Sequence, residues 1–429
     1  MIIRFTRFCI ILTGALFFGS SVVHAQDDIG IERYWRDGRP SFNIFQLREH
    51  LKKDESLSDI QRHLARTYLH IYALDFDKAE AELALAKEKI SGQEVNQDIN
   101  DQIYDISRNL LLAKGSYGEL AELYSEVEGQ DRELAKFYSK LSSFNSSTKR
   151  QSKPYELSNV ASDPGKRIVI KSTINGHQGE LLFDTGAVQS SIQIGTAKAA
   201  NVEVSDVSIT STGVGFTESL VVANLNGLAI GPVTQNDLPT LVPDSDTSVT
   251  SVHLFGELGV DGLIGVEQIS KLGRFSLIVS DDTVSSLRFD FPSKEEISDI
   301  PQNLLIRQNK LIAEIKIDGQ PYSCLVDTGS PVTFLSERIY ERHKKSTALK
   351  RLSPKAARRK GLTGYYKKPA FLERLDVEIA DRNVHFSNIE LIDTKGKWPD
   401  YCFIGLPSII QAGGATIDIS NRIITFGNK

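Results

Sequence analysis

The N-terminal third of the chain places its apolar residues at the spacing of amphipathic helices. Five runs between Phe45 and Leu141 repeat an apolar side chain every three or four positions. The first run consists of Leu57, Ile60, Leu64, Tyr68 and Ile71. Each stripe must be buried against a neighbouring element, and the short intervals between the runs favour stacked helical hairpins. The pattern therefore predicts an α-helical domain over residues 26–141.

Two turns in this region are similar to each other. The segments 75–79 (DFDKA) and 115–120 (GSYGEL) resemble the turn between the helices of tetratricopeptide-type repeats. Their aromatic residues, Phe76 and Tyr117, are 41 positions apart (117 minus 76), whereas a regular repeat of this type spans about 34. We expect a repeat-like helical region that binds a partner protein, holds substrate, or caps the domain that follows.

The pattern changes after residue 154. Segment 142–154 is rich in Ser and Lys and closes with Pro154, which is the composition of a linker. Beyond it, short β-branched runs such as 167–171 (RIVIK) and 311–317 (LIAEIKI) are separated by Gly and Asp. The sequence thus predicts an α+β multidomain protein, with a helical domain followed by a mainly β region.

Within the β region the sequence repeats itself. Asp184-Thr185-Gly186 follows an apolar pair and begins eight residues after Gly176. Asp327-Thr328-Gly329 likewise follows an apolar pair and begins eight residues after Gly319. Each copy is followed, about 80 residues later, by an apolar pair that ends in glycine, at Gly265 and Gly405. One Asp-Thr-Gly is common in ordinary turns, but two copies in the same context indicate a duplication with matched carboxylates.

These motifs resemble those of the aspartic proteases, and more closely those of their retropepsin-like branch. The resemblance covers about residues 160 to 429 and does not include the helical region. It implies two mainly β lobes, at residues 155–297 and 298–429, that form a pseudo-dimer with a cleft between them. Two alternatives stay open: each lobe pairs with its counterpart in a second chain as a homodimer, or the helical region is an inhibitory pro-segment.

The resemblance assigns catalysis to Asp184 and Asp327. Two carboxylates held a few Å apart share one proton and titrate as a coupled pair. The ionised carboxylate then accepts a proton from the attacking water, while the protonated one donates to the carbonyl oxygen of the scissile peptide. This mechanism needs no metal and no organic cofactor, and the sequence contains no zinc-protease, nucleotide-loop or serine-hydrolase motif.

The residues around the two carboxylates receive supporting roles from the same resemblance. Thr185 and Thr328 interlock their hydroxyl groups with the backbone of the opposing loop. Close passage of the backbone is the role of four glycines: Gly186, Gly329, Gly265 and Gly405. Ser330 stands where the first copy has Ala187, and its hydroxyl can hydrogen-bond a carboxylate. We therefore expect Asp327 to be the more readily ionised acid, with a pH optimum from mildly acidic to near neutral.

Retropepsin-like sites are covered by a glycine-rich hairpin flap, and each half of the repeat has a candidate. The first candidate contains Gly213, Gly215 and Phe216. The second contains Gly364, Tyr365 and Tyr366. These aromatic side chains either contact substrate or stand at plain hairpin tips. Segment 342–360 carries nine Lys and Arg and no acid, which indicates a solvated loop or a surface that attracts acidic substrates or membranes.

Residues 1–25 have the pattern of an export signal, with Arg4 and Arg7 before an apolar core and a small-x-small cleavage site ending at Ala25. We expect an exported protein, periplasmic or secreted, with no integral membrane segment after signal removal. Signal cleavage also removes Cys9, so that Cys324 and Cys402 remain. They either form a disulfide, since each lies three residues before a motif residue, or are buried free thiols.

The formal net charge of −5 argues against a nucleic-acid partner. We predict an exported aspartic endopeptidase that acts on peptide or protein substrates as a monomeric pseudo-dimer, with a partner protein possible at the helical domain. The competing prediction is a catalytically silent peptide- or protein-binding module that serves as an envelope interaction scaffold. Two matching acids favour the enzyme, because a binding module has no need for them.

Overall fold

The computed structural model describes most of the chain after the first 34 residues. The described residues are 35–36, 39–40, 44–53, 57–90, 97–126, 131–144, 146–149, 153–158, 160, 167–213, 216–245, 259–293, 300–346, 349–352, 360–361, 364–365, 370–392 and 402–427. The export signal predicted at residues 1–25 lies outside them. Within the described part of the chain, no helix combines the length and the apolar character needed to cross a membrane.

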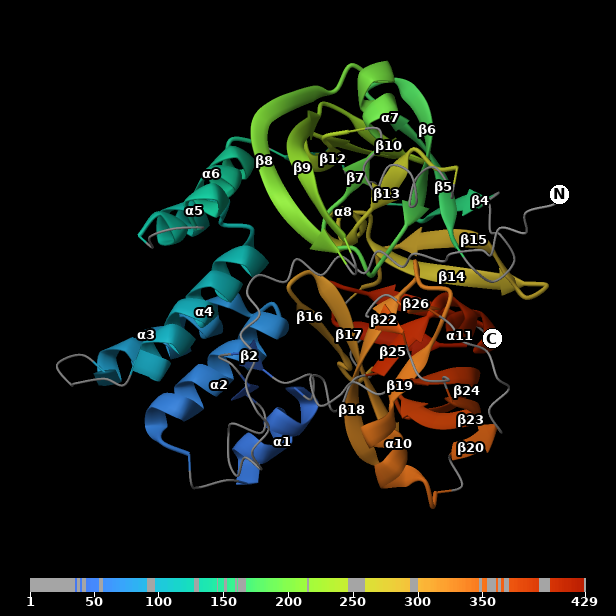
Figure 1. Ribbon diagram of the computed structural model, residues 1–429. Coiled ribbons are helices and arrows are strands. Elements are labelled where there is room, and N and C mark those ends of the chain that lie inside the picture. Colours follow the sequence, from blue (N-terminus) through green and yellow to red (C-terminus); the bar gives the residue numbers. More distant parts are fainter. Residues whose placement is uncertain are drawn as a thin grey trace.

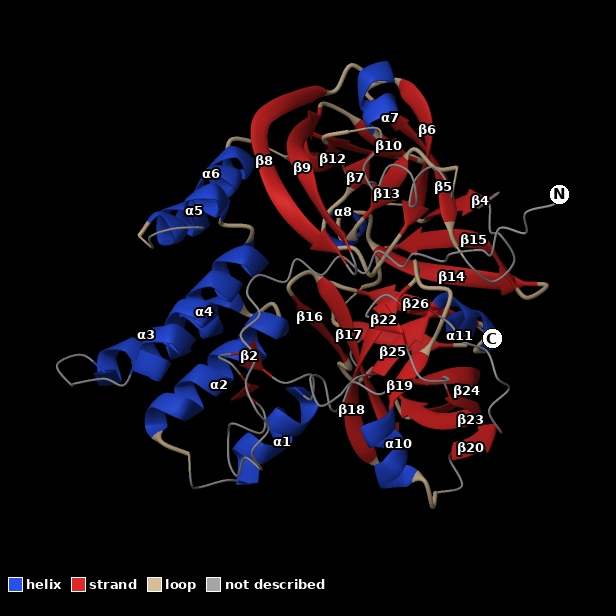
Figure 2. Cartoon of the chain, viewed as in Figure 1, coloured by secondary structure: helices blue, strands red, loops and turns tan. Residues whose placement is uncertain are grey.

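Six described helices form the N-terminal domain, namely the five that the apolar runs predict and one more before them (Figures 1 and 2). They are α1 (Ile44–Lys53), α2 (Asp59–Tyr72), α3 (Phe76–Ile90), α4 (Gln97–Lys114), α5 (Tyr117–Ser125) and α6 (Asp131–Ser142), preceded by a small pair of strands, β1 (Trp35–Arg36) and β2 (Arg39–Pro40). Helix α2 begins at a capping box, in which the Ser58 and Gln61 side chains bond each other's backbone N–H. The α2–α3 and α5–α6 pairs pack as neighbours.

Three large sheets follow in the part of the chain that the structure describes. The first sheet has the order β3-β11-β10-β5-β6-β13-β7-β12-β9-β8. Its strands are β3 (Ser147–Lys149), β5 (Val169–Ile174), β6 (His177–Phe183), β7 (Ser191–Ile192), β8 (Glu203–Gly213), β9 (Phe216–Leu225), β10 (Leu228–Ile230), β11 (Val233–Asn236), β12 (Leu238–Pro243) and β13 (Gly262–Ile264). Two short helices belong to this region, α7 (Ile194–Ala199) and α8 (Val266–Ile269).

The second sheet has the order β16-β17-β18-β25-β19-β24-β23-β20. Its strands are β16 (Leu304–Arg307), β17 (Lys310–Ile317), β18 (Gln320–Asp327), β19 (Phe334–Ser336), β20 (Leu349–Leu352), β23 (Ala370–Ile379), β24 (Arg382–Ile392) and β25 (Cys402–Gly405). The helices α10 (Glu337–His343) and α11 (Leu406–Gln411) and a separate pair of strands, β21 (Lys360–Gly361) and β22 (Gly364–Tyr365), belong to the same half.

A bridging sheet joins the two halves of the β region. It has the order β27-β26-β14-β15-β4 and takes strands from both halves of the repeat. Its members are β4 (Tyr155–Ser158), β14 (Arg274–Ser280), β15 (Thr283–Asp290), β26 (Gly414–Asp418) and β27 (Ile423–Phe426). The junction is the antiparallel pair β14–β26, in which Phe275 lies opposite Ile417. These two apolar side chains belong to one continuous core that extends through both halves.

The helical domain packs against both β halves (Figure 1). Helices α1 to α4 share a hydrophobic cluster with side chains of the second sheet, including Leu305, Ile312 and Phe403. Helices α5 and α6 share a separate cluster with Ile209 and Val222 of the first sheet. Because burial of apolar surface is the main stabilising term in packing, these two clusters attach the helical domain to both halves at once.

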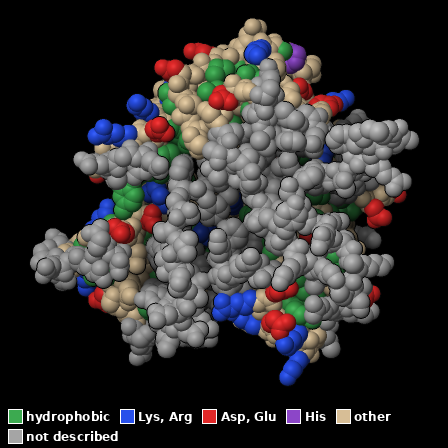
Figure 3. Space-filling view, in the orientation of Figure 1, with side chains coloured by type: hydrophobic (Ala, Val, Ile, Leu, Met, Phe, Trp, Pro, Cys, Tyr) green, Lys and Arg blue, Asp and Glu red, His purple; other side chains and the backbone are tan. Residues whose placement is uncertain are grey.

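The segment between the last helix of the helical domain and β4 contains a short strand. Segment 142–154 was predicted to be a linker, but it contains β3, which pairs with β11 at the edge of the first sheet. Thr148 lies opposite Gln235 in that pair. Without β3, β11 would be the edge of the sheet, and β3 pairs with the backbone groups that it would leave exposed. Over the described part of the face in Figure 3, acidic and basic side chains are interspersed.

Candidate active site

Asp184 and Asp327 occupy equivalent places in the two sheets. Asp184 directly follows β6, and Asp327 is the last residue of β18. Each of these strands runs parallel to the strand that carries the apolar-apolar-Gly motif, β13 beside β6 and β25 beside β18. Both carboxylates are buried, with 4% of Asp184 and 1% of Asp327 exposed. The fold thus brings together two acids that are far apart in the sequence.

Two threonines link the Asp184 and Asp327 loops. The Thr185 N–H donates to Thr328 Oγ1, and the Thr328 N–H donates to Thr185 Oγ1, both at 3.0 Å. The Thr185 hydroxyl donates to the Val326 carbonyl (2.9 Å), and the Thr328 hydroxyl donates to the Phe183 carbonyl (2.7 Å). Both side chains are fully buried. This reciprocal network has the arrangement that the resemblance implied, and it fixes the distance between the two loops.

The glycine of each triplet lies against the carboxylate of the other loop. A Cβ on Gly186 would collide with the Asp327 carboxylate, and one on Gly329 would lie 2.5 Å from Asp184 Cγ. Each glycine N–H also donates to Oδ1 of the aspartate two residues before it, at 2.8 Å. Only glycine leaves room for this approach, so the two carboxylates face each other across the loops.

Burial raises the pKa of both acids, and proximity to Asp184 raises that of Asp327 further. Loss of hydration raises the pKa of Asp184, while hydrogen bonds from Asp327 and from backbone N–H groups oppose this effect. The pKa of Asp327 lies well above its usual range because of burial and, in addition, the neighbouring charge of Asp184. Since the two groups titrate as a pair, the arrangement holds one shared proton over a range of pH. This is the state that acid–base catalysis at a peptide bond requires.

The role expected for Ser330 is wrong. Its hydroxyl donates to the Val332 carbonyl (2.9 Å) and accepts from the Val332 N–H (3.3 Å), two residues further along the loop. Serine commonly forms such local turns with its own backbone. The hydroxyl is therefore engaged away from the carboxylate, and the pKa of Asp327 is raised rather than lowered. Ser330 shapes the loop and gives no reason for Asp327 to ionise first.

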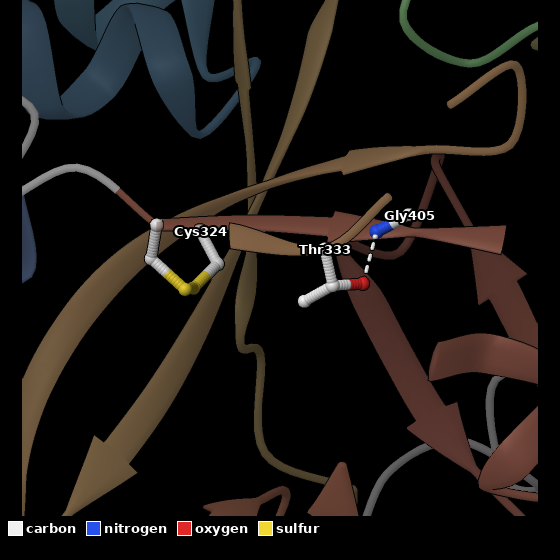
Figure 4. Close-up of a disulfide and its surroundings, with 4 residues drawn as sticks. Cys324, Thr333 and Gly405 are labelled. Carbon is white, nitrogen blue, oxygen red and sulfur yellow. Dashed lines mark hydrogen bonds between the residues drawn. A yellow bond between two sulfur atoms is a disulfide. The ribbon is translucent and has the colours of Figure 1, made fainter. Parts of the chain in front are cut away.

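The two apolar-apolar-Gly motifs pack behind the aspartate loops in equivalent ways. The Gly265 N–H donates to Ser190 Oγ (3.1 Å), and the Gly405 N–H donates to Thr333 Oγ1 (2.9 Å; Figure 4). The residue after each glycine donates its N–H to the loop beside the aspartate, which adds a second bond on each side. A Cβ on Gly405 would collide with the Val332 carbonyl, so the close packing requires glycine there.

Cys324 and Cys402 form a disulfide (Figure 4). They lie directly opposite each other on the parallel strands β18 and β25, with their Cα atoms 4.4 Å apart. Cys324 is three residues before Asp327, and Cys402 is three residues before Gly405. Of the two alternatives left open by the sequence, the bonded pair is the one found. The disulfide joins β18, which carries Asp327, to the neighbouring strand β25.

The two flap candidates have different surroundings. Gly213 ends β8 and lies opposite Phe216, the first residue of β9, so the first candidate is the tip of a long hairpin in the first sheet. Gly364 and Tyr365 form β22, which pairs only with β21 among the described residues. Gly215 and Tyr366 lie outside the described residues, as does much of segment 342–360.

Two contacts between the helical domain and the aspartate-bearing halves were not anticipated from the sequence. The Tyr117 hydroxyl at the start of α5 donates to Glu267 Oε2 (3.3 Å), and the Glu267 N–H donates to the Val188 carbonyl (3.4 Å) beside the Asp184 loop. Burial raises the pKa of Glu267. In the second sheet, Gln308 Nε2 donates to Asn109 Oδ1 of α4 (2.9 Å). The repeat-like turn around Tyr117 was the one sequence signal for either contact.

Comparison with known families agrees with this geometry. Residues 170–267 match the family described as aspartyl protease. The matched segment contains the first aspartate loop and Gly265, and it ends before the second aspartate. No match was found among curated proteins. The family match, together with a second Asp-Thr-Gly loop folded against the first, supports an aspartyl protease domain in this chain.

Proposed function

We propose that the protein is an exported aspartic endopeptidase. It hydrolyses peptide bonds with a water molecule activated between Asp184 and Asp327. The observation that carries this proposal is the mutual approach of the two carboxylates, each lying against the glycine of the opposing loop. A pair of buried acids with raised pKa values is costly for a fold, and such pairs are concentrated at catalytic sites.

In this mechanism the two acids exchange roles within one turnover. The ionised carboxylate takes a proton from the water, whose oxygen forms a bond to the carbonyl carbon, while the protonated carboxyl donates to the carbonyl oxygen. The carbon–nitrogen bond then breaks as the leaving nitrogen receives a proton from the dyad. The backbone N–H groups of Gly186 and Gly329, each bonded to one carboxylate, hold both acids in position throughout.

The two β halves act as retropepsin-like lobes of an intramolecular pseudo-dimer. This is supported by the correspondence of their hydrogen bonds, in which the Thr185 bonds match those of Thr328 and the Gly265 bond matches that of Gly405. Both aspartates of the pair come from one chain, so that pairing between two chains is not needed. The hairpin of β8 and β9 is the better flap candidate, because it is part of the same sheet as Asp184.

The helical domain holds the two lobes in their relative position. Its two hydrophobic clusters contact different lobes, so the helical domain packs on both of them. A partner protein at its outer surface is compatible with this role. Export rests on the pattern of residues 1–25, and it agrees with the disulfide, since such bonds persist in oxidising compartments.

The proposal is tested by incubating the mature protein with a library of unstructured peptides from pH 3 to pH 8 and identifying products by mass spectrometry. Asp184→Asn and Asp327→Asn are each expected to abolish cleavage while the fold is kept. Asp281→Asn is the matched control, because Asp281 lies in the exposed turn between β14 and β15. Tight peptide capture without products by the wild type would refute the proposal and favour a binding module.

A further inference from the structure

A lysine lies beside the aspartate pair in the second sheet. Strands β17 and β18 are antiparallel, and Ile312 lies opposite Leu325. Continuing this register by two residues brings Lys310, the first residue of β17, level with Asp327, the last residue of β18. Residues level with each other on adjacent antiparallel strands point to the same face, with Cβ atoms about 4.5–5.5 Å apart. The sheet therefore directs Lys310 to the face that carries the Asp327 carboxylate.

The helical domain holds the hairpin that carries this lysine. Arg307 and Lys310 close a two-residue turn, and both of its central residues, Gln308 and Asn309, have positive φ, at 48° and 55°. The Gln308 side chain donates to the buried Asn109 of α4 at 2.9 Å. This bond attaches the tip of the hairpin to a helix that is itself packed on the second sheet. The position of Lys310 is thus fixed by the pairing of β17 with β18 and by the hydrogen bond from its hairpin to α4.

Charge interactions connect Lys310 with the aspartate pair. Its side chain is half-buried, and burial together with the neighbouring Arg307 guanidinium lowers the pKa of Lys310 to about 8, against the opposing effect of Asp327 and Asp184. In return, the Lys310 ammonium lowers the pKa of Asp327. The charged groups that act on Lys310 come from three elements: Arg307 from β16, Asp327 from β18 and Asp184 from the first sheet.

We propose that Lys310 is a third ionisable residue of the active site, a positioning residue whose ammonium keeps one carboxylate of the aspartate pair ionised and so sets the pH range of catalysis. This inference rests on the proposed function. A buried acid pair without a cation loses its first proton only at higher pH, because desolvation opposes the appearance of a charge. A nearby ammonium stabilises the singly ionised pair, which is the form that activates water.

The first test compares the pH dependence of kcat/KM for Lys310→Met, Lys310→Arg and the wild type. Lys310→Met keeps the length of the side chain without its charge. It is expected to shift the acidic side of the kcat/KM profile, where activity falls as the pH is lowered, to higher pH by about one unit. Lys310→Arg should keep the acidic side where it is. The control is Lys171→Met, since Lys171 is exposed on β5. A Lys310→Met profile whose acidic side overlays that of the wild type would overturn the proposal, even if the rate falls.

The second test does not depend on proteolysis. NMR of the protein with ¹³C-methylated lysines follows the Lys310 amine, which is assigned by the signal missing from Lys310→Arg. We expect the Lys310 amine to titrate with a midpoint near pH 8 in the wild type. The midpoint should be clearly lower in Asp184→Asn/Asp327→Asn, because the negative charge of the aspartate pair no longer stabilises the ammonium. An unchanged midpoint in the double variant would contradict the proposal. If the wild type cleaves nothing but the midpoint still falls, the protease function fails while the lysine–aspartate coupling stands.

Discussion

Replacing Thr328 by valine tests whether the interlock of the two loops holds the active site together. Valine has the shape of threonine, so the packing is kept while the hydroxyl group is lost. The Thr328 hydroxyl accepts one hydrogen bond, from the Thr185 N–H, and donates another, to the Phe183 carbonyl. Thr328 has no exposed surface, so water cannot replace either bond. At about 1–3 kcal/mol for each buried group left unpaired, Thr328→Val should lower the free energy of unfolding by about 2–6 kcal/mol.

The assay combines urea unfolding with peptide cleavage under conditions where the variant remains folded. Thr328→Ser keeps the hydroxyl and is expected to lose much less stability. Thr185→Val should behave like Thr328→Val, since its hydroxyl makes the equivalent pair of bonds. Cleavage should fall in both valine variants, because the spacing of the carboxylates depends on the same bonds. A loss of less than about 1 kcal/mol, with cleavage unchanged, would refute the reasoning.

Three further changes test other parts of the site. Gly186→Ala should abolish cleavage in a peptide assay, since the added Cβ meets the Asp327 carboxylate. The control is Ala187→Gly, which changes the neighbouring residue without adding an atom. Because folding raises the pKa of Asp327, the folded state binds protons more tightly, so the wild type should lose stability as pH rises above about 4. Asp327→Asn should therefore be more stable than the wild type at pH 7 and lose this advantage near pH 3, as thermal melts can check; equal melting temperatures at both pH values would contradict it. Removing the disulfide with Cys324→Ser/Cys402→Ser opens a loop of 78 residues and should cost about 4 kcal/mol in urea unfolding, whereas a cost near zero would show that the bond adds no constraint.

The sequence was informative where a local pattern determines the structure. Apolar spacing predicted the helical domain, and the duplicated Asp-Thr-Gly identified both buried acids and the glycines that the close approach requires. It also placed Cys324 and Cys402 near each other, because the two motifs occupy neighbouring strands in each half. These predictions succeeded because each rests on residues whose backbone or steric requirement is specific.

Contacts between distant segments were harder to predict. The pairing of β14 with β26 and the docking of α5 on the first sheet depend on the shape of whole faces, which apolar spacing does not specify. The Ser330 error arose because a serine hydroxyl has a local partner available in its own turn. Lys310 was within reach of sequence reasoning, since the Asp318-Gly319 turn sets a register that brings it level with Asp327.

The central claim is that Asp184 and Asp327 of one chain form a single catalytic pair, and a complementation assay tests it most directly. Purified Asp184→Asn and Asp327→Asn proteins are mixed in equal amounts, and peptide cleavage is compared with that of the wild type. Each variant retains one aspartate, so a site built from Asp184 of one chain and Asp327 of another would regain an intact pair in the mixture. Lobes that pair with their counterparts in a second chain would instead leave one or both variants active alone. The intramolecular arrangement predicts that the mixture stays as inactive as either variant alone. Recovery of cleavage to a substantial fraction of the wild-type rate would contradict it.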